Sequence, residues 1–77
     1  MSSSLPKVIY HACVDGYLTE IQFEEGRSRL FSTIQEALTY LSFFCNPSVC
    51  PQEQVLERCS KSDILTRLIT EKEVENV

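Results

Sequence analysis

The sequence contains little glycine and little histidine. Gly16 and Gly26 are the only glycines among 77 residues, and His11 is the only histidine. Two isolated glycines cannot form a glycine-rich phosphate-binding loop, which needs several glycines at close spacing. His11 and Cys13 supply one conceivable nucleophile–base pair, with only Glu20 available to orient it. We therefore expect no enzymatic activity.

Long apolar runs and basic clusters are also missing. No segment approaches the roughly 20 apolar residues of a membrane-spanning helix, so we expect no membrane partner. The first six residues lack the basic and apolar regions of a signal peptide, which favours a cytoplasmic protein. The net charge is −4, and no basic patch is present. This charge disfavours nucleic acid as a partner.

The chain is long enough for one small domain. We expect a flexible lead over 1–6, a single α+β domain over 7–70 and a charged C-terminal tail over 71–77. A domain of this size buries a modest core. Such domains often complete their core by association, so a homodimer is a possible assembly.

Residues 7–31 predict three antiparallel strands. Asp15-Gly16 lies between two runs of alternating apolar residues, which is a strong hairpin signal. A type I′ turn there places Val14 opposite Tyr17. Glu25-Gly26 predicts a second two-residue turn before a third strand over 27–31, with Leu30 on the core side. On the outer face this register places His11 opposite Glu20.

The rest of the chain predicts helices. Ser32 and Gln35 have the spacing of a capping box, and a wide apolar stripe follows over 33–44. Pro51 suits the first position of a second helix over 52–59, and a third helix is expected over 63–71. The predicted fold is α+β: a three-stranded antiparallel β-meander packed by one long helix and followed by two short C-terminal helices.

The cysteines suggest three alternatives. Structural zinc usually needs four convergent ligands in closely spaced pairs. Cys45 and Cys50 approximate one such pair, Cys59 follows without a partner, and His11 and Cys13 lie on a strand. Cys45 and Cys50 are also close enough in sequence to form a disulfide. Free thiols are the preferred interpretation in the absence of a signal peptide, so no cofactor is expected.

A helix-turn-helix is a further alternative for the C-terminal region. The predicted helices over 51–59 and 63–71 are joined by a short polar turn. A recognition helix needs exposed basic or amide side chains. Only Lys61 and Arg67 are placed for this role, among several acidic residues. Packing of both helices on the sheet or on a partner is therefore preferred over a minimal DNA-binding regulator.

Part of the chain resembles HicB-type antitoxins. Asp15-Gly16-Tyr17, Phe31-Ser32-Thr33 and Glu36-Ala37-Leu38 are similar to the strand-strand-strand-helix unit of that family. The resemblance covers residues 7–44. The long proline-glycine hairpin and the appended DNA-binding module of the family are missing. The resemblance implies the architecture of this half of the chain and a protein-neutralising function.

The apolar residues on the predicted outer face favour a protein partner. We expect a small acidic, non-enzymatic protein-binding module that acts as an inhibitor, adaptor or antitoxin-like regulator by occluding a partner surface. A cysteine-based metal- or redox-responsive module is the alternative. The candidate partner-binding residues are Ile9, His11, Leu18, Glu20, Phe31, Tyr40 and Phe43.

Overall fold

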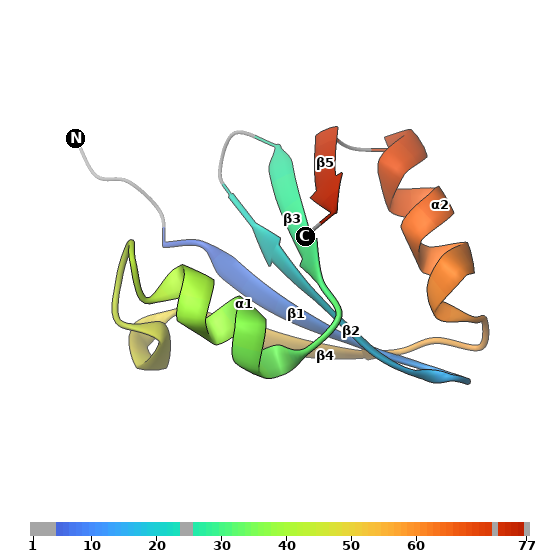
Figure 1. Cartoon of the computed structure of the whole chain (residues 1–77), viewed down its shortest axis with the longest axis horizontal. Coiled ribbons are helices and arrows are strands. Elements are labelled where there is room, and N and C mark those ends of the chain that lie inside the picture. Colours follow the sequence, from blue (N-terminus) through green and yellow to red (C-terminus); the bar gives the residue numbers. More distant parts are fainter. Residues whose placement is uncertain (1–4, 24–25, 72, 77) are drawn as a thin grey trace.

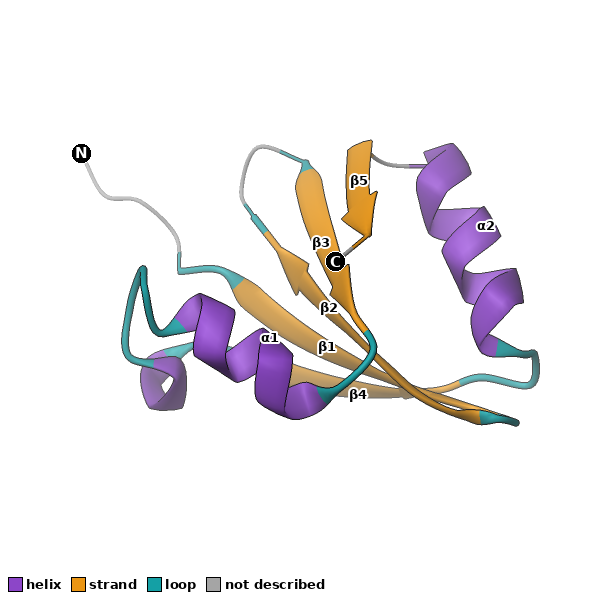
Figure 2. Cartoon of the chain, in the orientation of Figure 1, coloured by secondary structure: helices purple, strands orange, loops and turns teal. Residues whose placement is uncertain are grey.

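The chain folds into a twisted sheet with a helix on each face (Figure 1). The computed structural model describes residues 5–23, 26–71 and 73–76. Figure 2 separates the helices and strands by colour. The elements are, in chain order, β1 (Lys7–Cys13), β2 (Gly16–Gln22), β3 (Arg27–Phe31), α1 (Ile34–Leu41), the 3₁₀ turn η1 (Pro47–Val49), β4 (Gln52–Leu56), α2 (Lys61–Glu71) and β5 (Glu73–Asn76).

The sheet is mixed, and its strand order is β4-β1-β2-β3-β5. The first three strands are antiparallel neighbours, while β4 runs parallel to β1 and β5 runs parallel to β3. The α+β class is confirmed. The predicted three-stranded meander with one long and two short helices is wrong, because β4 extends the meander to a four-stranded mixed sheet and the short β5 adds to its other edge.

The segment predicted as a second helix is strand β4. It pairs with the free edge of β1, and backbone hydrogen bonds flank the pairing on both sides. Val8 N donates to Pro51 O at 2.9 Å, and Glu57 N donates to Ala12 O at 2.8 Å. Val55 and Leu56 are the only apolar residues of β4, too few for a helical stripe. Pairing with β1 therefore outweighs weak local preferences. It also removes the first helix of the proposed helix-turn-helix.

The two helices differ from their predicted bounds. α1 begins after Thr33, whose Oγ1 accepts a hydrogen bond from Glu36 N at 3.2 Å, so the cap lies one residue later than expected. The helix ends at Leu41, and residues 42–44 continue as a tighter turn. α2 begins after Ser60, which exchanges two hydrogen bonds with Asp63 in a capping box. The predicted tail over 71–77 contains β5.

The β1–β2 hairpin is confirmed, but its register differs by two residues from the prediction. Val8 pairs with Ile21, and Cys13 pairs with Gly16. Among the described residues only glycines have positive φ, so Asp15 does not form the type I′ turn. Because side chains alternate with a period of two, an even shift keeps each side chain on its predicted face.

The β2–β3 register differs by one residue, which exchanges the faces of β3. Phe23 N donates to Arg27 O at 2.8 Å, so Phe23 rather than Glu24 pairs with Arg27. Leu30 consequently pairs with Glu20, and Phe31 pairs with Thr19. Phe31 therefore points toward α1, although the sequence placed it on the outer face.

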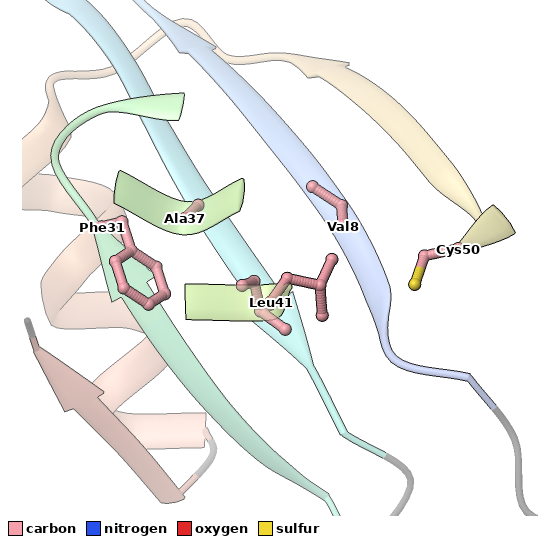
Figure 3. Packing of buried hydrophobic residues seen from close by; sticks show 6 residues of the cluster. Val8, Phe31, Ala37, Leu41 and Cys50 are labelled. Carbon is pink, nitrogen blue, oxygen red and sulfur yellow. The ribbon is translucent and has the colours of Figure 1, made fainter. Parts of the chain in front are cut away.

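Each face of the sheet has its own core. The core under α1 is formed by Val8, Ile21, Phe31, Ala37, Leu41 and Cys50; Figure 3 shows this packing. The core under α2 is formed by Leu18, Leu30, Ile64 and Leu68. In the described part of the chain, neither helix has the length and apolar character required to cross a bilayer.

Candidate functional site

The structure buries most of the residues predicted to contact a partner. Ile9, His11, Leu18 and Glu20 do lie on the face opposite α1, as predicted, but they are buried there. Phe31 is buried on the other face, beneath α1. The sequence prediction assigned the apolar residues of the second sheet face to a partner surface, whereas α2 packs on that face. Only Tyr40 and Phe43 of the seven candidates remain at or near the surface of the single chain.

A buried ionic network lies on the α2 side of the sheet. His11 Nε2 is 3.0 Å from Glu20 Oε1, and His11 Nδ1 is 3.1 Å from Glu57 Oε2. The side chains of His11, Glu20 and Glu57 are 5%, 1% and 9% exposed. A protonated imidazole donates from both nitrogens. The geometry therefore matches an imidazolium cation between two carboxylates.

Two further side chains complete this network. Ser28 Oγ donates to the second oxygen of Glu20 at 2.8 Å. Arg67 Nη2, on α2, donates to Glu57 Oε2 at 3.3 Å. Two cations thus face two carboxylates, which compensates the buried charges. The network connects β1, β2, β3 and α2 with the residue that follows β4.

The pKa values of the network shift in opposite directions. Burial favours neutral His11, but the hydrogen bonds and charges of Glu20 and Glu57 outweigh it and raise the His11 pKa above 6.5. The hydrogen bond from His11 lowers the Glu57 pKa; burial opposes this effect, and Arg67 adds to the lowering. Both shifts favour the charged forms. The network is therefore suited to hold elements together, since its reactive atoms are shielded from a substrate.

A second arrangement of residues lies along one side of α1. A shallow groove of about 530 Å³ is lined by Phe31, Thr33, Gln35, Glu36, Thr39, Tyr40 and Phe43. Phe43 and Phe44 follow α1 directly and are 79% and 60% exposed. We call Tyr40, Phe43 and Phe44 the aromatic surface. The sequence reasoning counted Phe44 in the apolar stripe of the helix and missed its exposure.

Contacts with neighbouring side chains hold Tyr40, one residue of the aromatic surface, in place. The Tyr40 ring centroid is 5.3 Å from that of Phe31 and 5.0 Å from that of Phe44. The Arg29 guanidinium lies 4.6 Å from the Tyr40 ring centroid, which is within the range of a cation–π contact. Phe23 contacts both Tyr40 and Phe44 edge to face. These contacts hold Tyr40 in place beside the exposed Phe44.

None of the described residues that line the groove is basic, although Arg29 on β3 contacts Tyr40. Between Arg29 and Arg58 the sequence contains Glu36, Glu53 and Glu57 but no lysine, arginine or histidine. Glu36 lines the groove itself. A ligand of this groove would therefore meet apolar rings beside the Glu36 carboxylate.

The structure brings two of the three candidate metal-ligating cysteines together. Cys45 Sγ and Cys50 Sγ are 2.9 Å apart. Cys59 lies instead beside the core under α2 and near Cys13. Across residues 5–23, 26–71 and 73–76, no group of three or more His, Cys, Asp or Glu side chains has an arrangement that could hold a metal ion. The pair is thus a dithiol at the end of α1.

Comparisons of this chain with protein-family models, with curated proteins and with solved structures find no match. Residues 7–41 form strands β1, β2 and β3 and helix α1 in that order, and none of the comparisons supports the resemblance to HicB-type antitoxins. A function for the protein is therefore inferred from its own side chains.

Proposed function

We propose that the protein is a non-enzymatic protein-binding module that captures an apolar, basic segment of another protein on the aromatic surface. The observation that carries the proposal is the exposure of Phe43, at 79%, beside a groove lined by Tyr40 and Phe31. Exposed aromatic rings around a depression are typical of binding sites for protein segments, because they bury a large area on contact.

The charge distribution supports a basic partner segment. Glu36 lies at the groove, and none of the described residues that line it is basic. Complementary charge around an apolar centre guides association and disfavours other partners. An amphipathic segment with apolar anchors and flanking lysine or arginine fits both features.

In the described part of the chain, no histidine or cysteine lines the groove. The lining side chains with polar groups are those of Thr33, Gln35, Glu36, Thr39 and Tyr40. Nucleophilic catalysis requires a hydroxyl or thiol within reach of a general base that is itself oriented. The buried network of His11, Glu20 and Glu57 lies on the other face of the sheet. Binding that occludes the partner segment therefore fits the groove better than chemistry does.

A peptide-display selection on the folded protein tests this function. We expect enriched peptides to combine apolar anchors with lysine or arginine, and their affinity to fall at least tenfold in a Phe43→Ser variant. Leu56→Ser is the matched control, because Leu56 is 80% exposed but lies on β4. Enriched peptides that bind the Phe43→Ser variant as tightly as the unmodified protein would contradict the proposal.

A further inference from the structure

The loop between α1 and β4 holds two thiols against each other. Cys45 N donates to Leu41 O at 3.1 Å, which ties Cys45 to the last turn of α1. Cys50 N donates to Pro47 O at 3.2 Å, which closes η1. The sulfurs of Cys45 and Cys50 are 2.9 Å apart. A disulfide bond is about 2.05 Å long, so the sulfurs must approach by only about 0.9 Å to form one.

The side chain of Asn46 holds this loop in shape. Asn46 Oδ1 accepts hydrogen bonds from Ser48 N at 3.1 Å and from Ser48 Oγ at 2.9 Å. These bonds cap η1, and Pro47 occupies its first position. The distance between the two cysteines is therefore set by the hydrogen bonds of η1 as well as by their short separation in sequence.

The two thiols have different surroundings. Cys50 is 5% exposed and belongs to the core under α1, whereas Cys45 is only partly buried. Burial and the neighbouring Cys45 raise the pKa of Cys50 to about 11, so Cys50 remains a protonated thiol at neutral pH. A small oxidant from solvent therefore meets Cys45 first, and Cys50 is placed to react second.

We propose that Cys45 and Cys50 form a reversible intramolecular disulfide in response to hydrogen peroxide. The Cys45 thiolate attacks one peroxide oxygen, the O–O bond breaks, and Cys45 becomes a sulfenic acid while hydroxide leaves and is protonated to water. The Cys50 sulfur then attacks the Cys45 sulfur, and the hydroxyl leaves with the Cys50 proton as a second water. Two thiols are oxidised and one peroxide is reduced to two waters.

The disulfide would join two elements that frame one side of the α1 core. Cys45 follows the turn after α1, and Cys50 precedes Pro51, whose carbonyl accepts the hydrogen bond from Val8 at the start of β1. The bond would close a short loop of residues 45–50 and reduce the freedom of the unfolded chain. Oxidation should therefore raise the melting temperature by at least about 4 °C. This inference does not depend on the proposed function.

Trypsin digestion followed by mass spectrometry tests the proposal, because it places the Cys45–Cys50 pair and the other two cysteines in different peptides. Cleavage after lysine and arginine leaves Cys45 and Cys50 together in peptide 30–58, Cys13 in peptide 8–27 and Cys59 in peptide 59–61. The folded protein is treated with equimolar hydrogen peroxide, alkylated and digested. We expect peptide 30–58 to lose two hydrogens, about 2 Da, and to take up no alkyl group until dithiothreitol is added.

Three controls test whether disulfide formation depends on the folded structure. Asn46→Ala, which removes the cap of η1 and leaves both thiols, should slow disulfide formation several-fold. Unfolding in urea should slow it at least tenfold. The Cys13→Ser/Cys59→Ser double variant should react as the unmodified protein does. Any of three results would overturn the proposal. Peptide 30–58 could stay fully alkylated, or a disulfide between peptides 8–27 and 59–61 could form first. The third is an equal rate of disulfide formation in native and urea-unfolded protein.

Discussion

Glu57 Oε2 lies 3.1 Å from His11 Nδ1, although 46 residues separate them in the chain. His11 is in the middle of β1, and Glu57 follows β4 directly. The contact depends on the parallel pairing of β1 and β4, which places His11 beside Val55 and Ala12 beside Leu56. It therefore links the ionic network to the part of the fold that the sequence did not predict.

Replacing His11 with leucine should destabilise the protein strongly. The variant removes the cation between Glu20 and Glu57, and breaking a buried ion pair costs about 3–5 kcal/mol. Urea unfolding followed by circular dichroism measures the loss. Lys7→Met is the matched control, because it breaks the exposed Lys7–Glu53 ion pair and should cost less than about 1 kcal/mol. Equal losses in the two variants would show that the network is not needed for the fold.

The single histidine allows its pKa to be measured directly. His11 is the only histidine, so its imidazole ring gives one set of proton resonances that can be followed through a pH titration by NMR. We expect a midpoint above 6.5, because Glu20 and Glu57 favour the imidazolium more than burial disfavours it. Glu57→Gln should lower this midpoint. A midpoint below 6.5 in the unmodified protein would mean that burial dominates.

The network should give stability an optimum in mildly acidic solution. The raised pKa of His11 contributes stability that is fully present below 6.5 and is lost as the pH rises through the folded-state value. The lowered pKa of Glu57 contributes stability that is present above 4.5 and is lost as the pH falls through its folded-state value. We expect the free energy of unfolding to be highest between 4.5 and 6.5.

Urea denaturation at a series of pH values tests this optimum. The Glu57→Gln variant should show a flatter dependence on both sides, because it removes one titrating group and weakens the shift of the other. A stability that keeps rising from pH 6.5 to 8 in the unmodified protein would contradict the assignment.

Neighbouring residues on α2 should differ sharply in their effect on stability. Leu68 is buried against the sheet, and Ile69 is more than half exposed. Leu68→Ala should cost about 2–5 kcal/mol, since it leaves a cavity in the core under α2. Ile69→Ala removes a similar apolar group and should cost less than about 0.5 kcal/mol. Both values come from chemical denaturation, and similar costs would show that α2 does not pack on the sheet as described.

The local signals in the first half of the chain predicted the structure well. The hairpin, the third strand and the helix beginning near Thr33 all appear, because each has its own turn or cap. The side chains of β1 and β2 lie on their predicted faces, because the observed register differs from the predicted one by two residues, an even number. Phe31 lies on the opposite face from the predicted one, because the observed β2–β3 register differs from the prediction by one residue.

The second half could not be predicted from local pattern. β4 contains only Val55 and Leu56 as apolar residues, and its position depends on the exposed edge of β1. β5 similarly depends on the free edge of β3. The partner-binding prediction named Tyr40 and Phe43, which lie at or near the surface, together with five residues that the fold buries. The role of Glu57 in the ionic network was not predicted, because its segment was assigned to a helix. The short sequence separation of Cys45 and Cys50 did indicate that they could lie close together.

NMR chemical-shift mapping tests most directly whether a partner segment binds on the aromatic surface. The ¹⁵N-labelled protein is titrated with a peptide recovered from the display selection. We predict that the largest shifts fall in residues 33–44, around Tyr40, Phe43 and Phe44, and that the Leu56 amide does not move. Shifts concentrated on α2 or on the β1–β2 hairpin, with residues 33–44 unchanged, would contradict the account.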